Sequence, residues 1–170
     1  IAGNKKLSGT FYKKLRQTEG MSNLKSIRFG DLDEKKAAAL HGDCVFQLER
    51  IGLEDSGGVS SRAFDKLLSA ECMKEVHSLE MLSESYPDEL SEALQKNEAL
   101  LPELKHLKHL FFYPTEGIRD WSASGILPRL ESFRFGMIHH YGDNLATLLT
   151  TENFPKLKHL HVSDIALANH

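Results

Sequence analysis

The chain has 170 residues, enough for one domain with a substantial hydrophobic core, which we place over residues 1–170. A formal net charge of −3 at pH 7 leaves no overall preference for nucleic acid or for an anionic membrane surface, so neither is expected as a partner. No apolar run approaches the ~18 residues of a membrane-spanning helix, and two cysteines are too few for a disulfide framework, which together predict a cytoplasmic protein.

The N-terminal segment predicts a helix. Leu7, Phe11 and Leu15 are spaced by four residues, which places them near one stripe of a helix over residues 7–17. We interpret residues 1–20 as the helix of a partial repeat unit. The chain starts without an initiator Met or a signal-peptide pattern, which predicts a fragment of a longer protein.

Six later segments share a pattern of four apolar residues, φ-x-x-φ-x-x-φ-x-φ, where φ is apolar and x is any residue. The closing φ-x-φ has a period of two, which predicts a short strand whose two apolar anchors point to the core side. The first anchors of successive strands are 24, 28, 31, 23 and 27 residues apart, and this spacing indicates a repeat architecture. The predicted strands are Ile27–Phe29, Ile51–Leu53, Leu79–Met81, Leu110–Phe112, Phe133–Phe135 and Leu160–Val162.

Helical segments are predicted between the strands. They start at residues that can cap a helix, such as Asp33 and Ser60 or Ser61, or carry acidic residues in the first turn. Their apolar residues fit one face. The interval 115–125 is interrupted by glycine and predicts at most a short helical turn. The predicted helices cover residues 33–40, 60–68, 87–94 and 142–149.

The fourth strand has two candidate registers, because residues 101–114 read LPELKHLKHLFFYP and contain the phrase L-K-H-L twice. We favour Leu110 as the first anchor, since a shift to Leu107 would put His109 at the second apolar position. The doubled phrase is then a three-residue insertion within one repeat. Two other units place proline five residues before the first anchor, whereas five residues after Pro102 is Leu107, and this offset agrees with the insertion. The register that starts at Leu107 stays open as the alternative.

The series of units resembles the leucine-rich repeat superfamily, and its helical units of about 27 residues are most similar to the ribonuclease-inhibitor-like subclass. That subclass includes the ligand-sensing domains of NOD-like innate immune receptors and the cytosolic ribonuclease inhibitors. The resemblance covers essentially the whole chain. It implies an α/β solenoid of about six irregular repeats, with a parallel sheet on the concave side of a horseshoe arc and helices on the convex side.

No residue pattern predicts catalysis or a cofactor. The chain lacks H-E-x-x-H, C-x-x-C and G-x-S-x-G, so we expect no enzyme activity. His159 and His161 point to the same side of a strand, but a third ligand is missing nearby, so no metal site is expected. Cys44 and Cys72 occupy equivalent positions in consecutive units and are either two buried thiols or a disulfide.

The residues between and beside the anchors are predicted to point away from the core and to form a partner-binding surface. Aromatic side chains beside Arg and His are typical of interface hot spots, and there is no basic stripe for nucleic acid. The alternative is that a neighbouring loop covers the central aromatic residues. The predicted partner-binding residues are Arg28, Arg50, Glu80, Leu82, His109, Phe111, Tyr113, Arg134, His159 and His161.

The resemblance implies a recognition or autoregulatory module that binds a protein or microbial ligand, in the manner of the sensing domain of a NOD-like receptor. Contacts with other domains of the parent chain are expected as well. The alternative is an intracellular enzyme inhibitor or ubiquitin-ligase substrate adaptor that uses the same concave surface. Because the last unit ends without a polar capping repeat, we also expect self-association through the uncapped ends.

Overall fold

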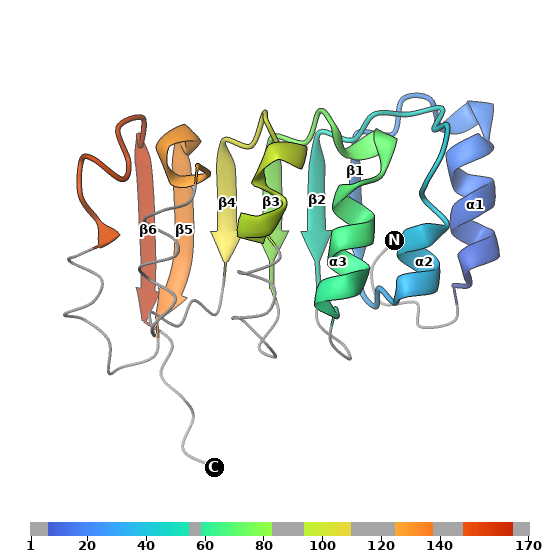
Figure 1. Ribbon diagram of the computed structural model, residues 1–170, viewed down its shortest axis with the longest axis horizontal. Coiled ribbons are helices and arrows are strands. Elements are labelled where there is room, and N and C mark those ends of the chain that lie inside the picture. Colours follow the sequence, from blue (N-terminus) through green and yellow to red (C-terminus); the bar gives the residue numbers. More distant parts are fainter. Residues whose placement is uncertain (1–6, 55–58, 83–93, 110–124, 138–147, 165–170) are drawn as a thin grey trace, which may run out of the picture.

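The computed structural model describes residues 7–54, 59–82, 94–109, 125–137 and 148–164 (Figure 1). Within these residues the fold is α/β, with six strands in one parallel sheet that follows the chain order β1 to β6. No helix among them is long and apolar enough to span a bilayer. The strands are β1 (Ser26–Phe29), β2 (Arg50–Leu53), β3 (Ser78–Met81), β4 (His106–His109), β5 (Ser132–Met137) and β6 (His159–Asp164).

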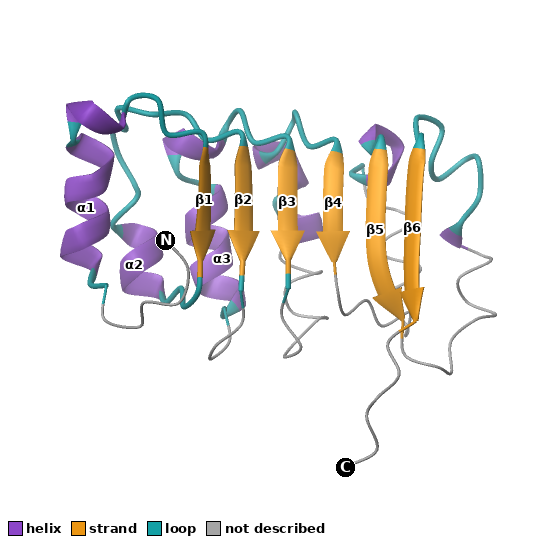
Figure 2. Cartoon of the chain, turned by 180° about the vertical axis from the view of Figure 1, so that it is seen from behind, coloured by secondary structure: helices purple, strands orange, loops and turns teal. Residues whose placement is uncertain are grey.

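The described helices cover one side of the sheet. Figures 1 and 2 show opposite faces of the molecule, and the strands stand behind the helices in one and in front of them in the other. Helix α2 packs against both α1 and α3. The helices are α1 (Gly9–Gln17), α2 (Glu34–Ala38) and α3 (Ser61–Leu68), with short 3₁₀ helices η1 (Glu19–Met21), η2 (Glu71–Met73), η3 (Glu98–Leu100) and η4 (Leu127–Arg129).

Local sequence explains where α2 and α3 begin. The Asp33 carboxylate accepts a hydrogen bond from the backbone N–H of Lys36 at 2.8 Å, and the Ser60 hydroxyl accepts one from Ala63 at 3.2 Å. Both are N-caps that satisfy an otherwise unpaired N–H group at the start of a helix. The predicted helices over 7–17, 33–40 and 60–68 are therefore confirmed as α1, α2 and α3. The predicted helices over 87–94 and 142–149 lie almost entirely outside the described residues.

The strands alternate as the φ-x-φ pattern predicts. In β1, Ile27 and Phe29 are buried while Ser26 and Arg28 are exposed. The parallel register then places like residues side by side, so Ile27 pairs with Ile51 and Ile51 with Leu79. Buried anchors of successive strands thus form continuous apolar rows beneath the helices, and each fully buried aliphatic side chain contributes about 1.5–3 kcal/mol.

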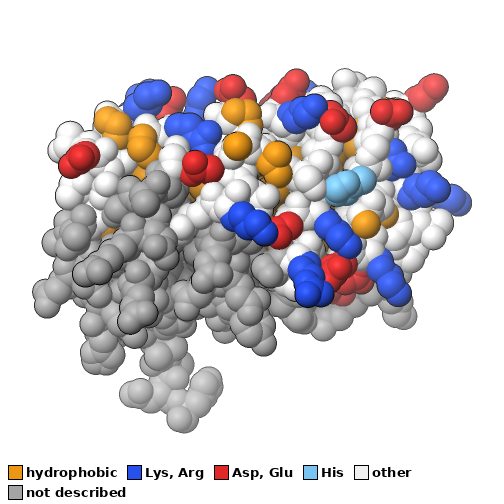
Figure 3. Space-filling model, viewed as in Figure 1, with side chains coloured by type: hydrophobic (Ala, Val, Ile, Leu, Met, Phe, Trp, Pro, Cys, Tyr) orange, Lys and Arg blue, Asp and Glu red, His pale blue; other side chains and the backbone are white. Residues whose placement is uncertain are grey.

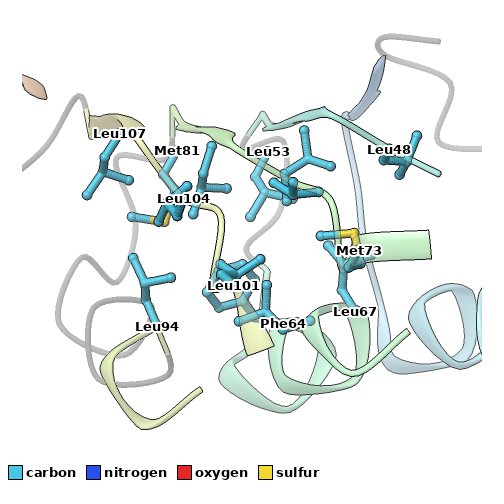
Figure 4. Close-up of a cluster of buried hydrophobic side chains, with 14 of the residues drawn as sticks. Leu48, Leu53, Phe64, Leu67, Met73, Met81, Leu94, Leu101, Leu104 and Leu107 are labelled. Atoms are coloured by element: carbon cyan, nitrogen blue, oxygen red, sulfur yellow. The ribbon is translucent and has the colours of Figure 1, made fainter. Parts of the chain in front are cut away.

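The hydrophobic core lies between the sheet and the helices. Figure 4 shows Phe64 and Leu67 of α3 beside Leu101 and Met73, with the strand anchors Leu53 and Met81 on the opposite side of the same cluster. Leu101, Leu104 and Leu107 continue the cluster toward β4 and are almost completely buried.

The predicted register of the fourth strand is wrong. Strand β4 is His106–His109, and Leu107 pairs with Leu79 on one side and Phe133 on the other. The spacing of first anchors becomes 24, 28, 28, 26 and 27 residues, and Leu107 lies five residues after Pro102, as in the two other proline-bearing units. The predicted strand Leu110–Phe112 lies outside the described residues.

Backbone hydrogen bonding explains this register. The N–H groups of Lys105 and His106 both donate to the carbonyl of His77 at 2.9 Å, and the Glu131 N–H donates to Lys105 at 2.8 Å. The same two-to-one pattern enters β2, where Glu49 and Arg50 donate to Lys25. Because each of β2 to β6 starts with this pattern, the register places His109 at the second anchor position, opposite Met81 and Phe135.

The last strand differs from the others in burial. Leu160 and Val162 align with Phe133 and Phe135 in the register. The two phenylalanines are completely buried, whereas Leu160 and Val162 are each 46% exposed. Strand β6 is at the end of the sheet and has one neighbouring strand among the described residues. The alternation of side chains along β6 therefore determines which side of the sheet Leu160 and Val162 face. Burying them would require further residues packed against this end of the sheet.

Candidate partner-binding face

The side of the sheet opposite the helices carries the predicted partner-binding residues, and we call it the sheet face (Figure 2). It consists of the outward residues of each strand, the residue that immediately precedes each strand, and Glu54, which directly follows β2 and pairs with Arg28. Parallel sheets usually have both faces covered, so exposed charged side chains here are informative. The charged and imidazole residues of the sheet face are Lys25, Arg28, Glu49, Arg50, Glu54, His77, Glu80, Lys105, His106, Lys108, Glu131, Arg134, Lys158, His159 and His161.

The part of the sheet face on β1–β3, which we call the closed half, neutralises its own charges. Nη1 of Arg28 lies 3.2 Å from the Glu54 carboxylate, and Nη2 lies 2.6 Å from Glu80. Residue 52 lies between them on β2, and it is glycine. A Cβ atom there would lie 3.0 Å from Nε of Arg28, so glycine leaves room for the arginine to cross β2 and reach β3.

A shallow hollow accompanies this arrangement. Its volume is about 310 Å³, and its lining includes Arg28, Arg50, Gly52 and Glu80. Ser26 and Ser78, the register partners of Arg50, also line it. The hollow is polar and is bridged by an ion pair, so it offers hydrogen-bonding groups to a partner that approaches the sheet.

The residues that precede the strands form a charged border along one edge of the sheet face. Lys25 lies 3.2 Å from Glu49, which in turn lies 3.8 Å from His77. At the other end, Lys158 lies 2.7 Å from Glu131, and its ammonium group is the main reason that the pKa of the Glu131 carboxyl lies below its ordinary value. Ion pairs thus engage both border carboxylates.

The part of the sheet face on β4–β6, which we call the open half, has basic residues in consecutive strands. Lys108, Arg134 and His161 are neighbours in the register. Lys108 is 4.0 Å from Glu80, whose carboxylate is closer to Arg28. Arg134 is exposed and makes no ion pair with any described residue.

Imidazole side chains border the open half. His106 is on β4 and His159 on β6, with Ser132 between them. The rings of His77 and His106 meet edge to face, with centroids 5.9 Å apart. Partial burial, followed by the neighbouring His77, lowers the pKa of His106 below its ordinary value, which favours the neutral ring near pH 7.

The structure places six of the ten predicted residues on the outward side of their strands: Arg28, Arg50, Glu80, Arg134, His159 and His161. Leu82 directly follows β3 and is half-buried. The register position predicted for His109 is wrong, because its partners on the adjacent strands are Met81 and Phe135. Phe111 and Tyr113 lie outside the described residues.

Two residues of the open half were missed by the sequence prediction. Lys108 occupies the register position assigned to Phe111, and His106 occupies the one assigned to His109. The spacing from Pro102 to Leu107 was the signal that could have found them. The surface therefore changes in character at β4, from aromatic as predicted to cationic as observed.

The two cysteines are free thiols away from the sheet face, Cys44 in the segment between α2 and β2 and Cys72 in η2. The Cys44 thiol donates a hydrogen bond to the Leu40 carbonyl at 3.5 Å and is half-buried. Burial, reinforced by the neighbouring Cys44, raises the pKa of the Cys72 thiol well above its ordinary value. Such a thiol is a poor nucleophile. Among the described residues, no group of three or more His, Cys, Asp or Glu side chains is placed to hold a metal ion.

On the helix side, the described residues show no comparable concentration of one charge. Basic and acidic side chains are intermixed over it (Figure 3). A hollow of about 660 Å³ lies between α2 and α3, where Glu34 and Lys66 form an ion pair of 3.1 Å. The charge asymmetry is thus a property of the sheet face.

The sheet face offers ionic and hydrogen-bonding groups on a rigid scaffold, which suits reversible recognition. Comparisons of the chain with models of protein families, with curated proteins and with solved structures find no match.

Proposed function

We propose that the chain is a protein-recognition module of the leucine-rich repeat type, and that the sheet face is its binding surface. One observation carries the proposal. The six strands are parallel and follow the chain order, and the described helices lie on one side, so the opposite side presents a wide array of charged residues. Parallel sheets are ordinarily covered on both faces, and a partner would supply the second cover.

The repeat spacing supports the same proposal. With Leu107 as the fourth anchor, every interval between first anchors lies between 24 and 28 residues, within the range of leucine-rich repeats. Stacked units of this kind bury a continuous core and expose an extended surface for binding. The proposal includes the curvature of a solenoid, which small-angle X-ray scattering of the protein would test against a flat, compact α/β domain.

The parent protein in this proposal is a cytoplasmic receptor of the NOD-like type, in which the module senses a ligand or restrains a neighbouring domain. An enzyme inhibitor or a ubiquitin-ligase adaptor is the alternative within the same binding class. A nucleotide-binding segment in the parent chain would favour the receptor, whereas a ligase-recruiting domain would favour the adaptor.

Site-specific photo-crosslinking tests the proposed function. A photoreactive amino acid would replace Ser132 in the centre of the sheet face or Lys13 on the exposed side of α1, each within the full chain in its own cells. We expect a discrete protein adduct from position 132 that excess unlabelled protein suppresses, and none from position 13. Equal adducts at both positions, or adducts from position 13 alone, would contradict the sheet face as the binding surface.

A further inference from the structure

The two halves of the sheet face differ in charge. In the closed half, the basic residues Lys25, Arg28 and Arg50 are matched in number by the acidic residues Glu49, Glu54 and Glu80. In the open half, only Glu131 is set against Lys105, Lys108, Arg134 and Lys158. The open half is therefore basic on a chain whose net charge is −3.

The carboxylates nearest to the open half are already engaged. Glu80 is held by Arg28 at 2.6 Å and lies 4.0 Å from Lys108. Glu131 is held by Lys158 at 2.7 Å. The folded chain thus leaves Arg134, and most of the charge of Lys108, without compensation among the described residues.

The geometry favours a ligand that crosses the strands. Lys108, Arg134 and His161 are in register on adjacent strands, so their row spans roughly 10 Å at the usual spacing of about 4.8 Å between strands. The second row, of His106, Ser132 and His159, lies two residues away along the strands. Carboxylates two residues apart in an extended segment are separated by about 7 Å, so one can reach Lys108 or Arg134 in the first row while another meets the histidines of the second row.

The size of the patch favours a protein segment over nucleic acid. A nucleic acid presents a phosphate every few ångströms along its length and is typically bound by a long basic stripe. Here the basic region is limited to three strands, and the closed half beside it is neutral. A short run of Asp or Glu residues matches this extent.

We infer that the open half binds a partner protein through an acidic segment that lies across β4–β6 and pairs with Lys108 and Arg134. The histidines of both rows supply further hydrogen-bond donors, and additional positive charge when protonated. This inference rests on the proposed function, and it names the chemistry of the partner.

The test uses fluorescence anisotropy with a labelled peptide of alternating Glu and Gly. Matched peptides of alternating Gln and Gly and of alternating Lys and Gly, and a labelled oligothymidine, are the comparison ligands. We expect the Glu peptide to bind best and to be released by salt, because the contacts are exposed ion pairs. Arg134→Glu combined with Lys108→Glu should weaken its binding by about tenfold.

The control is Lys13→Glu combined with Lys14→Glu, which makes the same change in net charge on exposed residues of α1. This control should bind the Glu peptide like the unmodified protein, and thermal unfolding should show that both double variants are folded. Equal weakening by the control pair would reduce the effect to net charge and overturn the inference. So would equal binding of the Gln peptide, absence of Glu-peptide binding, or tighter binding of oligothymidine that the sheet-face pair abolishes.

Failure of this inference is distinguishable from failure of the proposed function. A partner crosslinked at position 132 together with no preference for the Glu peptide would retain the binding surface and exclude an acidic segment. Absence of any adduct from the sheet face would instead remove the proposed function itself.

Discussion

The closed and open halves of the sheet differ on both sides. In the closed half, the anchors Ile27, Ile51 and Leu79 are buried, and the outward Arg28 is held by two carboxylates. In the open half, the anchors of β6 are half-exposed, and Arg134 has no ion-pair partner among the described residues. The difference teaches that one continuous sheet can concentrate buried anchors and paired charges at one end, and half-exposed anchors and a charge without an ion-pair partner among the described residues at the other.

The largest expected effect compares the same substitution at both ends of the sheet. Leu53 is completely buried in β2, so Leu53→Ala should lower the free energy of unfolding by roughly 2–5 kcal/mol. Leu160 is 46% exposed in β6, so Leu160→Ala should cost only about 1 kcal/mol. Urea denaturation measures both. A similar loss for the two variants would show that the anchors of β6 are covered in solution.

Thiol labelling compares the two ends within one molecule. In a Cys44→Ser, Val162→Cys variant, the thiol introduced on half-exposed β6 should react at once with a disulfide reagent. Cys72 is completely buried and should react at least about 100-fold more slowly, because its labelling requires local opening. Two kinetic phases, resolved by mass spectrometry of the labelled peptides, are the expected result. One fast phase for both thiols would show that Cys72 is accessible to the reagent in the folded protein.

A single substitution should make the charge of the closed half more like that of the open half. Glu80→Gln removes the carboxylate that holds Arg28 at 2.6 Å. Because exposed ion pairs contribute about 0–1 kcal/mol, stability should change by no more than that. Affinity for the Glu peptide should rise about two- to threefold, since Arg28 and Lys108 both lose a competing acid. Unchanged or weaker peptide binding would argue against carboxylate pairing as the difference between the halves.

The smallest expected effect is on the pH dependence of stability. Burial, His77, Lys105 and His159 lower the pKa of His106, while Glu131 raises it, and the net pKa lies below the ordinary value. The unfolded chain therefore takes up more protons as the pH falls from about 7.5 to 5.5, and stability is lost in that window. His106→Gln should lose less stability over the same window in urea titrations. An equal loss in both proteins would assign the effect to other groups.

Much of the fold could be predicted because local sequence controls it. The φ-x-φ anchors of five strands match the observed strands, since alternation requires only that neighbouring residues point to opposite sides. The caps Asp33 and Ser60 were found for the same reason, as each acts on a backbone group three residues away. The candidate site could be predicted only in part. The alternation of a strand shows which side chains point outward, but it does not show whether a charged side chain is already paired with another.

The fourth strand shows where local reasoning failed. Two phrases of L-K-H-L satisfied the apolar pattern almost equally, and the rejected register placed a histidine in an anchor row. In the observed register, the hydrogen bonds from Lys105 and His106 to His77 continue the pairing found at the start of β2, β3, β5 and β6. A periodicity rule that weighted the proline spacing would have favoured Leu107.

The sequence by itself determined the apolar anchors of five of the six strands, the side of the strand that each of them faces and the caps of α2 and α3, because these features depend on contacts within a few residues. Only the tertiary structure decided the register of β4, the exposure of Leu160 and Val162, and the pairing of charges across strands. Arg28 and Glu80 are far apart in the chain and meet only because Gly52 lies between them in the sheet. The contrast between a neutral and a basic half of one surface therefore depends on how the repeats stack.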